Sequence, residues 1–222
     1  MKVIDFYWDP VSPYAWLAST QIAAFRKRHG ARIRYRPVLL AGLLDVHGNV
    51  GPAEIPAKRT YVARDVMRWA RRHGLAFQGP PAHPFNPLKA LRMAFCVPDD
   101  DEREHFANAL LAAAWADGRD ITEDETLVAV ANHVGLDGRE LLAEAGEAVN
   151  KQGLRRQTDV AAAMGIFGVP TFVVDGELFW GNDRLEFLSA HLMGQIPIDR
   201  EAFDRFLARP ATASRTPREG HG

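Results

Sequence analysis

The sequence predicts an α/β fold in which strands near both ends of the chain share one sheet and flank a block of helices. Three observations lead to this prediction. The first 40 residues follow a strand–helix–strand pattern, residues 41–150 carry helical patterns after a glycine-rich stretch, and strand patterns return near residue 171. Because a two-stranded sheet is marginal in water, neither end is stable alone, and we expect the two ends to pair with each other.

The first unit is a parallel crossover. Residues 2–8 are almost continuously apolar, which indicates a strand buried on both faces. Ser12 and Pro13 then form a helix start, with serine at the N-cap and proline at the first helical position. The helix closes on basic residues and Gly30. Residues 32–38 alternate by twos, so a second strand follows, and a strand–helix–strand order of this kind favours parallel pairing.

The middle of the chain is helical. We expect residues 41–55, which contain three glycines and a proline, to form a long irregular loop. Two later helices are expected to begin at Thr122 and Asp137, because each is followed three positions on by a glutamate, as in a capping box. The other helices of this part are predicted over residues 56–73, 87–97, 101–117 and 151–164.

The last third returns to strands. Residues 171–174 and 177–180 flank Asp175-Gly176, which is a strong signal for a two-residue hairpin. A helix is predicted at about 183–193, and the small polar residues from Arg209 onward predict a disordered tail. The expected organisation is a discontinuous α/β domain of residues 1–40 plus 151–208, a helical insertion domain of residues 41–150, and a tail of residues 209–222.

Composition excludes several classes of protein. The chain of 222 residues has 27 Lys and Arg against 28 Asp and Glu, so its charge gives no sign of nucleic acid or an anionic membrane as the main partner. No apolar run approaches the ~18 residues of a membrane span, and no signal peptide is evident, so we expect a cytoplasmic protein. Cys96 is the only cysteine and is predicted to be a buried hydrophobe. The eight scattered histidines predict no metal site.

Four motifs occur together along the chain: Phe6-Tyr7-x-Asp9-x-x-Ser12-Pro13-Tyr14-x-x-Leu17-Ala18, Gly48-Asn49-Val50-Gly51-Pro52, Gly168-Val169-Pro170-Thr171-Phe172 and Phe179-Trp180-Gly181-Asn182-Asp183-Arg184-Leu185. In this order and with this spacing they resemble 2-hydroxychromene-2-carboxylate isomerases, a glutathione-dependent family similar in fold to kappa-class glutathione transferases and to disulfide oxidoreductases. The resemblance covers about residues 2–195. It implies a thioredoxin-like fold with an inserted all-helical domain, a cis bond between Val169 and Pro170, and a homodimer.

Ser12 occupies the position that carries the chemistry in this fold. Disulfide oxidoreductases of the fold place Cys-x-x-Cys where this chain has residues 12–15, Ser-Pro-Tyr-Ala. With both thiols absent, dithiol exchange is excluded. A hydroxyl at a helix N-terminus lies beside free backbone N–H groups and the positive end of the helix dipole, which is a good place to stabilise a thiolate. A plain N-cap is the alternative, but the resemblance implies that Ser12 binds the glutathione sulfur and is the catalytic residue.

The resemblance also implies a set of glutathione-binding residues. Backbone groups of Val169, beside Pro170, would pair with the cysteinyl part as an added strand does. Asn182 and Asp183 would hold the γ-glutamyl end, although an N-cap and a first-turn acid would look the same in the sequence. Asn49 and Lys58 would reach in from the insertion. The lysine would meet the glycyl carboxylate, and the alternative is that it is simply a solvated helix residue.

Substrate-binding residues are predicted only by their proximity to the motifs. An aromatic acid substrate needs a stacking surface and a cationic or amide partner for its carboxylate. Most aromatic residues belong to a core, which is the alternative for each candidate. The segment of residues 83–87 is less polar than the corresponding family region, so the exact substrate stays open. The candidates are Trp8, Tyr14, His83, Phe85, Asn86 and Trp180, with Arg92 as a carboxylate partner.

Three functions are compatible with these residues. The first is isomerisation of 2-hydroxychromene-2-carboxylate, a small aromatic acid, to trans-o-hydroxybenzylidenepyruvate by reversible thiolate addition, with glutathione as a cofactor that is not consumed. The second is a kappa-like transferase that conjugates or reduces small electrophiles. The third is a non-catalytic thioredoxin-like binding protein or chaperone. The joint presence of the predicted glutathione-binding residues argues against the third.

Overall fold

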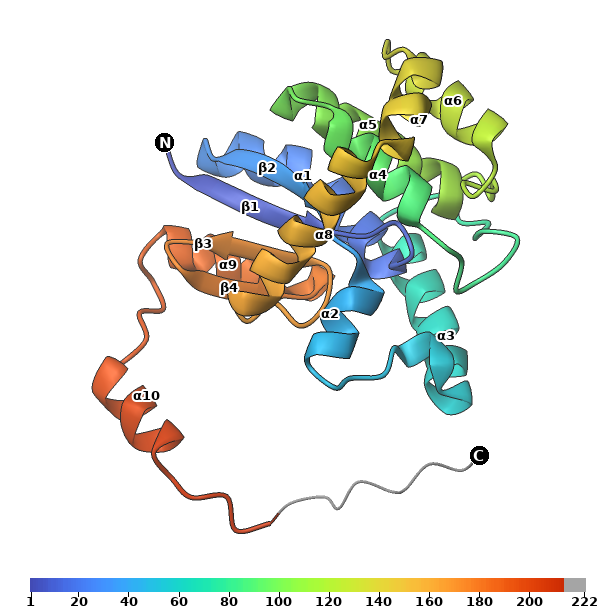
Figure 1. Cartoon of the computed structure of the whole chain (residues 1–222). Helices are drawn as coiled ribbons and strands as arrows, with labels where there is room; N and C mark the ends of the chain where they lie inside the picture. The colour runs from blue at the N-terminus through green and yellow to red at the C-terminus, as the bar shows by residue number, and fades with distance from the viewer. Residues whose placement is uncertain (214–222) are drawn as a thin grey trace.

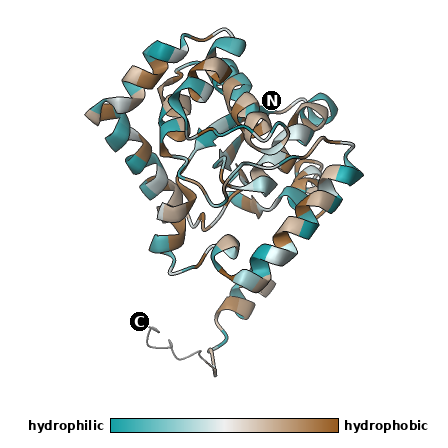
Figure 2. Cartoon of the chain, turned by 90° about the vertical axis from the view of Figure 1, so that its right-hand side faces the viewer, coloured by the Kyte–Doolittle hydropathy of each residue, from teal (hydrophilic) through white to brown (hydrophobic). Residues whose placement is uncertain are grey.

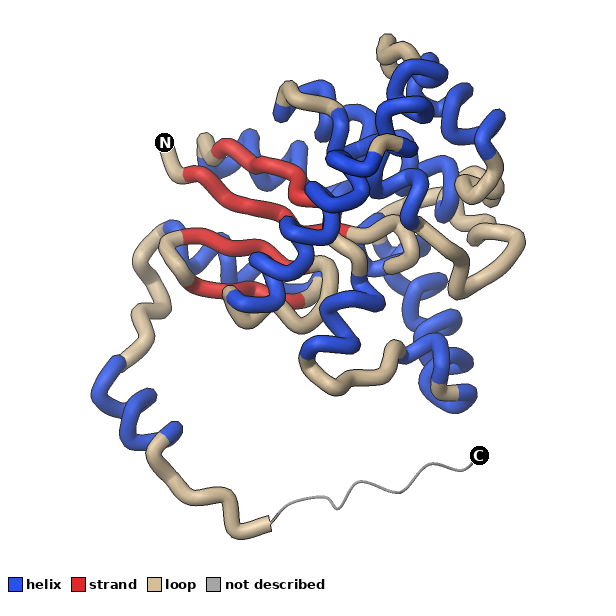
Figure 3. Tube along the Cα trace, viewed as in Figure 1, coloured by secondary structure: helices blue, strands red, loops and turns tan. Residues whose placement is uncertain are grey.

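The computed structural model describes residues 1–213, so most of the tail predicted to be disordered, residues 214–222, lies outside the described residues. One four-stranded sheet runs through the molecule in the order β2-β1-β3-β4, and helices surround it (Figures 1 and 3). Its central pair joins the two ends of the chain, because β1 and β3 are antiparallel neighbours. The shared sheet is therefore confirmed. The strands are β1 Val3–Trp8, β2 Arg32–Pro37, β3 Thr171–Val174 and β4 Glu177–Trp180.

The first crossover has the predicted form. β1 and β2 pair in parallel, with Val3 opposite Arg32, and α1 (Pro13–His29) connects them. The Ser12 side chain caps α1 by accepting the N–H of Ala15, and the helix ends at Gly30, whose φ of 60° needs a residue without Cβ strain.

Both faces of the sheet are covered by apolar clusters. Phe6 and Trp8 of β1 belong to a large core that includes α1, while Tyr7 between them faces a smaller cluster with Leu43 and Ile166. Because side chains alternate across a strand, this arrangement explains the nearly continuous apolar run at the start of the chain. Figure 2 shows hydrophilic and hydrophobic residues together along the surrounding helices, as expected of helices that bury one side.

The predicted irregular loop at residues 41–55 is wrong in its first half. Helix α2 spans Leu40–Val46, and a 3-10 turn, η1, spans Pro52–Glu54. Gly42 misled the prediction, since it serves packing instead of a turn. A Cβ built there would lie 3.2 Å from Cγ2 of Thr158, so the glycine lets α2 approach α8 (Ala148–Ala163) closely.

The helical block otherwise follows the predicted order, with one corrected helix start. Asp137 caps its helix, accepting the N–H groups of Arg139 and Glu140 at 3.0 Å each. Thr122 does not cap: its hydroxyl donates to Asp120, and the next helix begins two residues later. The helices are α3 Pro56–Arg72, α4 Leu88–Cys96, α5 Asp100–Trp115, α6 Asp124–His133 and α7 Gly138–Gly146.

The C-terminal third contains the predicted hairpin and one unexpected helix. Asp175 and Gly176 have φ values of 52° and 82°, as a type I′ turn between β3 and β4 requires. A 3-10 turn, η2 (Asn182–Arg184), leads into α9 (Leu185–Leu192). Helix α10 (Arg200–Leu207) was not predicted, and it stands away from the body of the molecule (Figure 1). Of the described helices, none is long and apolar enough to cross a membrane.

Two glycines of α7 provide a test of the insertion's packing. A Cβ at Gly138 would lie 2.4 Å from the backbone oxygen of Val128, whereas a Cβ at Gly146 would meet nothing within 4 Å. Gly138→Ala is expected to lower the free energy of unfolding by about 2 kcal/mol, because backbone cannot move aside as a side chain can. Gly146→Ala is the matched control and is expected to be neutral or to stabilise by up to about 1 kcal/mol. Urea unfolding measures both, and equal effects would contradict the packing argument.

Candidate active site

The candidate site lies where the N-terminus of α1 meets the loop before β3. The Ser12 hydroxyl donates to the backbone oxygen of Val169 at 3.3 Å, across 157 positions of sequence. The same hydroxyl accepts the N–H of Ala15 at 3.3 Å, and only 5% of Ser12 is exposed. The peptide bond between Val169 and Pro170 is cis, as the resemblance implies. Two of the four motifs therefore meet at one hydroxyl group.

The fourth motif joins the same place through Gly181. Its N–H donates to the backbone oxygen of Pro170 at 2.9 Å, which fixes η2 beside the cis-proline loop, and η2 also packs against α1. Asn182 is 6% exposed, and within residues 1–213 its Nδ2 has no hydrogen-bond partner. The Asp183 carboxylate is more exposed and lies 3.1 Å from the guanidinium of Arg184. An amide donor without a partner and a carboxylate thus accompany Ser12.

Tyr14 connects this region to the insertion. Its hydroxyl donates to the Asp65 carboxylate of α3 at 2.9 Å. Burial and then this hydrogen bond raise the pKa of the Tyr14 phenol well above its ordinary value, and the charge of Asp183 acts in the same direction. The phenol is therefore neutral at any physiological pH. Sequence reasoning missed Asp65, because one acid on a helix with many charged residues carries no distinguishing signal.

Asn49 and Lys58 are the predicted glutathione-binding residues that lie on the insertion. Asn49 follows α2, where its N–H donates to the backbone oxygen of Leu44, and Lys58 lies in the first turn of α3. Both residues are exposed. In the described part of the chain, neither side chain forms a hydrogen bond or ion pair with protein, with Ser12 or with any other residue. Their role in binding stays a prediction.

An aromatic pair lies at the cis-proline loop. Trp180 is 52% exposed and packs edge-on against Phe167, with ring centroids 4.8 Å apart. A Cβ at Gly168 would lie 2.8 Å from Nε1 of Trp180, so the indole rests directly over this backbone. Trp180 was a predicted substrate contact. Phe167 was missed, although an aromatic residue just before the Gly-Val-Pro motif was a usable signal.

His83 and Asn86 have structural partners in the loop before α4. His83 Nε2 lies 3.0 Å from the backbone oxygen of Val11, beside the Ser12 loop, and its ring meets Trp115 edge-on. Burial lowers the pKa of His83, so the ring is neutral at neutral pH. Asn86 is exposed, and its Oδ1 accepts the N–H of Leu88 at the start of α4. His83 braces the loop that carries Ser12, whereas Asn86 caps a helix.

One predicted substrate contact, Trp8, is corrected by its burial. Trp8 is 0% exposed and packs against Tyr35, so it belongs to the core and offers no stacking face. Arg92 lies on α4, which packs against β2 and helices of the insertion. Its buried Nε has no hydrogen-bond partner among the described residues, and its role as a carboxylate partner stays a prediction. Phe85 is half-buried against the large core.

Cys96 takes no part in this site. It is partly buried at the end of α4, and burial, followed by the charge of Glu144, raises the pKa of the Cys96 thiol to about 11. The thiol is therefore protonated and unreactive at neutral pH. In the same described part of the chain, no group of three or more His, Cys, Asp or Glu side chains is placed to hold a metal ion.

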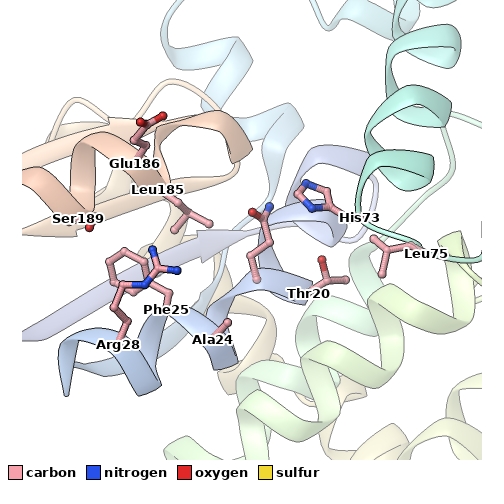
Figure 4. Close-up of a pocket in the computed structure, with 10 residues that line it drawn as sticks. Thr20, Ala24, Phe25, Arg28, His73, Leu75, Leu185, Glu186 and Ser189 are labelled. Atoms are coloured by element: carbon pink, nitrogen blue, oxygen red, sulfur yellow. The ribbon is translucent and has the colours of Figure 1, made fainter.

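A separate hollow of about 500 Å³ lies farther along α1, between that helix, α9 and the end of α3 (Figure 4). Its walls carry both apolar and charged side chains, including Phe25, Arg28 and Glu186. Thr20 is the lining residue of α1 nearest in sequence to Ser12, and none of the predicted site residues lines the hollow. The hollow and the Ser12 site are therefore different places on the molecule.

A helix-capping serine that bonds to the cis-proline loop of the neighbouring strand defines a thioredoxin-type protein, here without redox thiols. The chain belongs to the DSBA-like thioredoxin domain family, which matches residues 3–193. It is 31% identical to the 2-hydroxychromene-2-carboxylate isomerase of Sphingobium xenophagum over 194 residues, covering 86% of this chain and 98% of the relative. It is 28% identical to glutathione S-transferase kappa 1 of Rattus norvegicus over 212 residues, covering 87% and 92%.

Solved structures agree with this placement. A structure of 2-hydroxychromene-2-carboxylate isomerase superposes with a TM-score of 0.80 at 26% identity, covering 91% of this chain and 98% of that chain. A probable DsbA oxidoreductase from Streptomyces coelicolor superposes with a TM-score of 0.67 at 21% identity, covering 90% and 93%, and shows the fold alone. The thioredoxin-like fold with a helical insertion between strands is therefore confirmed.

Proposed function

We propose that this protein is a glutathione-dependent isomerase that converts 2-hydroxychromene-2-carboxylate to trans-o-hydroxybenzylidenepyruvate. The observation that carries the proposal is the contact between Ser12 and Val169, which places a hydroxyl at a helix N-terminus opposite the backbone of the cis-proline loop. Two relatives whose names specify this isomerase and a glutathione transferase support the substrate class and the cofactor.

The residues present fit glutathione. The buried Nδ2 of Asn182 has no partner in the described residues and is a donor available to a carboxylate. The exposed Asp183 carboxylate beside it suits an ammonium group. Together they match the charged γ-glutamyl end of the tripeptide. The backbone of Val169 is placed to pair with the cysteinyl part in the manner of an added strand.

Ser12 supplies the hydrogen bond that favours an ionised sulfur. In this structure its hydroxyl donates to Val169 at 3.3 Å, a long bond that a rotation about the C–O bond can exchange for a bond to a ligand. The backbone oxygen of Val169 is then free to accept an N–H of the ligand. An ordinary thiol has a pKa of about 8.5, and lowering it by two units is worth ~2.7 kcal/mol, which is within reach of one charge-assisted bond and a helix N-terminus.

When bound, glutathione would supply a thiolate nucleophile for reversible addition to a conjugated carbon of the substrate, which would permit rotation about the former double bond before elimination returned the thiolate. The exposed Trp180 and its neighbour Phe167 provide an aromatic surface beside Val169 on which the substrate ring can stack. Tyr14 is neutral and hydrogen-bonded to Asp65, so it orients the bound ligand and does not exchange its proton with it.

The second candidate function is a kappa-like transferase that consumes glutathione. The similarity to glutathione S-transferase kappa 1 favours it, and the thiolate-stabilising geometry would be the same. The two candidates differ in stoichiometry, because only the transferase joins or oxidises the thiol in each turnover.

The test is a thiol-dependent assay with purified protein freed of small thiols. 2-Hydroxychromene-2-carboxylate is supplied with and without glutathione, and the product's absorbance and the remaining free thiol are followed together. Rapid product formation that requires glutathione without consuming it is the expected result. Loss of thiol in step with product would establish the transferase instead. Failure to bind glutathione at millimolar concentration would overturn both the isomerase and the transferase. It would then favour the third function, a non-catalytic thioredoxin-like binding protein.

The remaining expectations are part of the same proposal. We propose a cytoplasmic homodimer with no nucleic-acid or membrane partner, supported by the family resemblance and by the nearly neutral formal charge of −1. Size-exclusion chromatography with light scattering tests the dimer, with a monomer mass as the contrary result.

A further inference from the structure

Asp9 is a buried acid directly beside Ser12 that the proposed chemistry does not use. It is 0% exposed and directly follows β1, at the start of the loop that leads to Ser12. Its Oδ1 accepts the N–H of Val11 at 2.9 Å, and its backbone oxygen accepts the N–H of Ser12 at 3.0 Å. Side chain and backbone of one residue therefore shape the turn that presents the serine hydroxyl.

The other carboxylate oxygen of Asp9 reaches a different part of the chain. Oδ2 accepts the N–H of Leu40, the first residue of α2, at 2.8 Å. The N–H of the preceding residue, Leu39, donates to Thr158 on α8 at 3.1 Å. At its far end, α2 is tied to the cis-proline side of the site, because His47 Nε2 lies 3.1 Å from the backbone oxygen of Ile166.

We propose that Asp9 is a positioning residue that locks the Ser12 loop and α2 together, so that the serine hydroxyl and the segment carrying Asn49 address one ligand. The inference rests on the proposed glutathione site. Its basis is that one carboxylate accepts two backbone N–H groups, one from Val11 in the Ser12 loop and one from Leu40, which lies 31 positions after Asp9 in the sequence.

A carboxylate suits this task better than an amide. Each of its oxygens accepts one of the two N–H groups, whereas asparagine would turn an NH2 group toward one of them and leave that donor unsatisfied. Burial is costly for the charge and raises the pKa of Asp9 to about 7, against the two backbone bonds that lower it. No ion pair reaches Asp9 in residues 1–213, so the two N–H groups are what holds the ionised form.

The first test is Asp9→Asn at pH 8, with Asp5→Asn as the matched control. Asp5 lies on β1, four positions before Asp9, and pairs with Arg34 and Arg36. Asp9→Asn is expected to raise the pKa of the bound glutathione thiol, measured by ultraviolet absorbance, by about one unit and to weaken glutathione binding about tenfold, because the Ser12 hydroxyl loses its alignment with the sulfur. Removal of the Asp9 charge without this loss of alignment would shift the thiol pKa in the opposite direction. Asp5→Asn is expected to change neither value. A merely structural role for Asp9 would lower stability without moving the thiol pKa in the folded protein.

A second pair of variants cuts only the link to α2. Leu40 is the first helical residue, where proline is tolerated, and Leu39 before it is already extended at φ −83° and ψ 110°. Leu40→Pro removes the N–H that reaches Asp9, whereas Leu40→Ala keeps it and loses the same side-chain packing. Weaker glutathione binding in Leu40→Pro than in Leu40→Ala is expected, by about fivefold to tenfold.

The outcomes separate this inference from the proposed function. If the wild-type protein binds no glutathione, both fall. If the wild-type protein binds glutathione, while Asp9→Asn leaves its affinity and thiol pKa unchanged and the two Leu40 variants agree, the positioning role of Asp9 is wrong and the glutathione site stands.

Discussion

Replacing Ser12 with alanine is expected to lower kcat/KM for isomerisation about 10- to 100-fold and to raise the pKa of bound glutathione thiol by about one to two units, because one charge-assisted hydrogen bond is lost. The hydroxyl is the only side-chain donor that the structure places on Val169 at the N-terminus of α1 within residues 1–213. The remaining backbone N–H groups of the helix still favour an anion, so the activity falls without disappearing.

The Ser12 experiment needs two further variants, because this serine is also the N-cap of α1. An alanine N-cap costs about 1 kcal/mol of stability, whereas glycine costs only a few tenths, so Ser12→Gly removes the hydroxyl with less damage to the helix. Ser19→Ala is the matched control, since Ser19 is a buried serine of the same helix that bonds to Trp16. A thiol pKa that stays unchanged in both Ser12 variants would remove this residue from the mechanism.

Much of the fold could be predicted because its signals are local. The apolar run of β1, the serine and proline at the start of α1, and the Asp175-Gly176 turn each fix one element through nearby residues. Pairing of the two ends followed from counting strands. For the site, the resemblance that the motifs carry implied the roles of Ser12 and Val169, and the structure brings these two residues together.

The errors arise where tertiary contacts decide the local structure. Gly42 suggested a loop, but α8 requires a small residue at that point of α2. Thr122 had the right spacing for a capping box, yet a hydrogen bond to Asp120 takes its hydroxyl. Trp8 was close to a motif in sequence, but strand alternation turns it into the core, a face that proximity alone does not specify.

Residues that link separate segments were the hardest to find. Asp65 acquires its role only from its hydrogen bond to Tyr14, 51 positions earlier in the sequence. Asp9 was visible as a motif residue, but its bond to Leu40 depends on α2, which the sequence did not reveal. A site of this kind is therefore predictable at its motifs and is completed by contacts that only the structure provides.

Replacing Gly181 with alanine is expected to have the largest effect on ligand binding, because this glycine is constrained twice. Its φ of 120° and ψ of 152° fall in a region of backbone space that is essentially restricted to glycine. A Cβ there would also lie 2.5 Å from Oδ1 of Asp183, so the carboxylate would have to leave its place. We expect a loss of about 2 to 3 kcal/mol of stability and at least a tenfold weaker affinity for glutathione, since strain and a displaced charge act together.

Gly176→Ala separates these two effects. Gly176 also has a positive φ, 82°, at the other end of β4, but a Cβ there would meet nothing within 4 Å. Its substitution strains the backbone by about 1 to 2 kcal/mol and leaves Asp183 where it is. Calorimetric binding of glutathione, measured beside urea unfolding, should therefore be impaired in Gly181→Ala and normal in Gly176→Ala. If both variants lose affinity in proportion to their stability, the placement of Asp183 by Gly181 does not control binding, and the γ-glutamyl end of the ligand lies elsewhere.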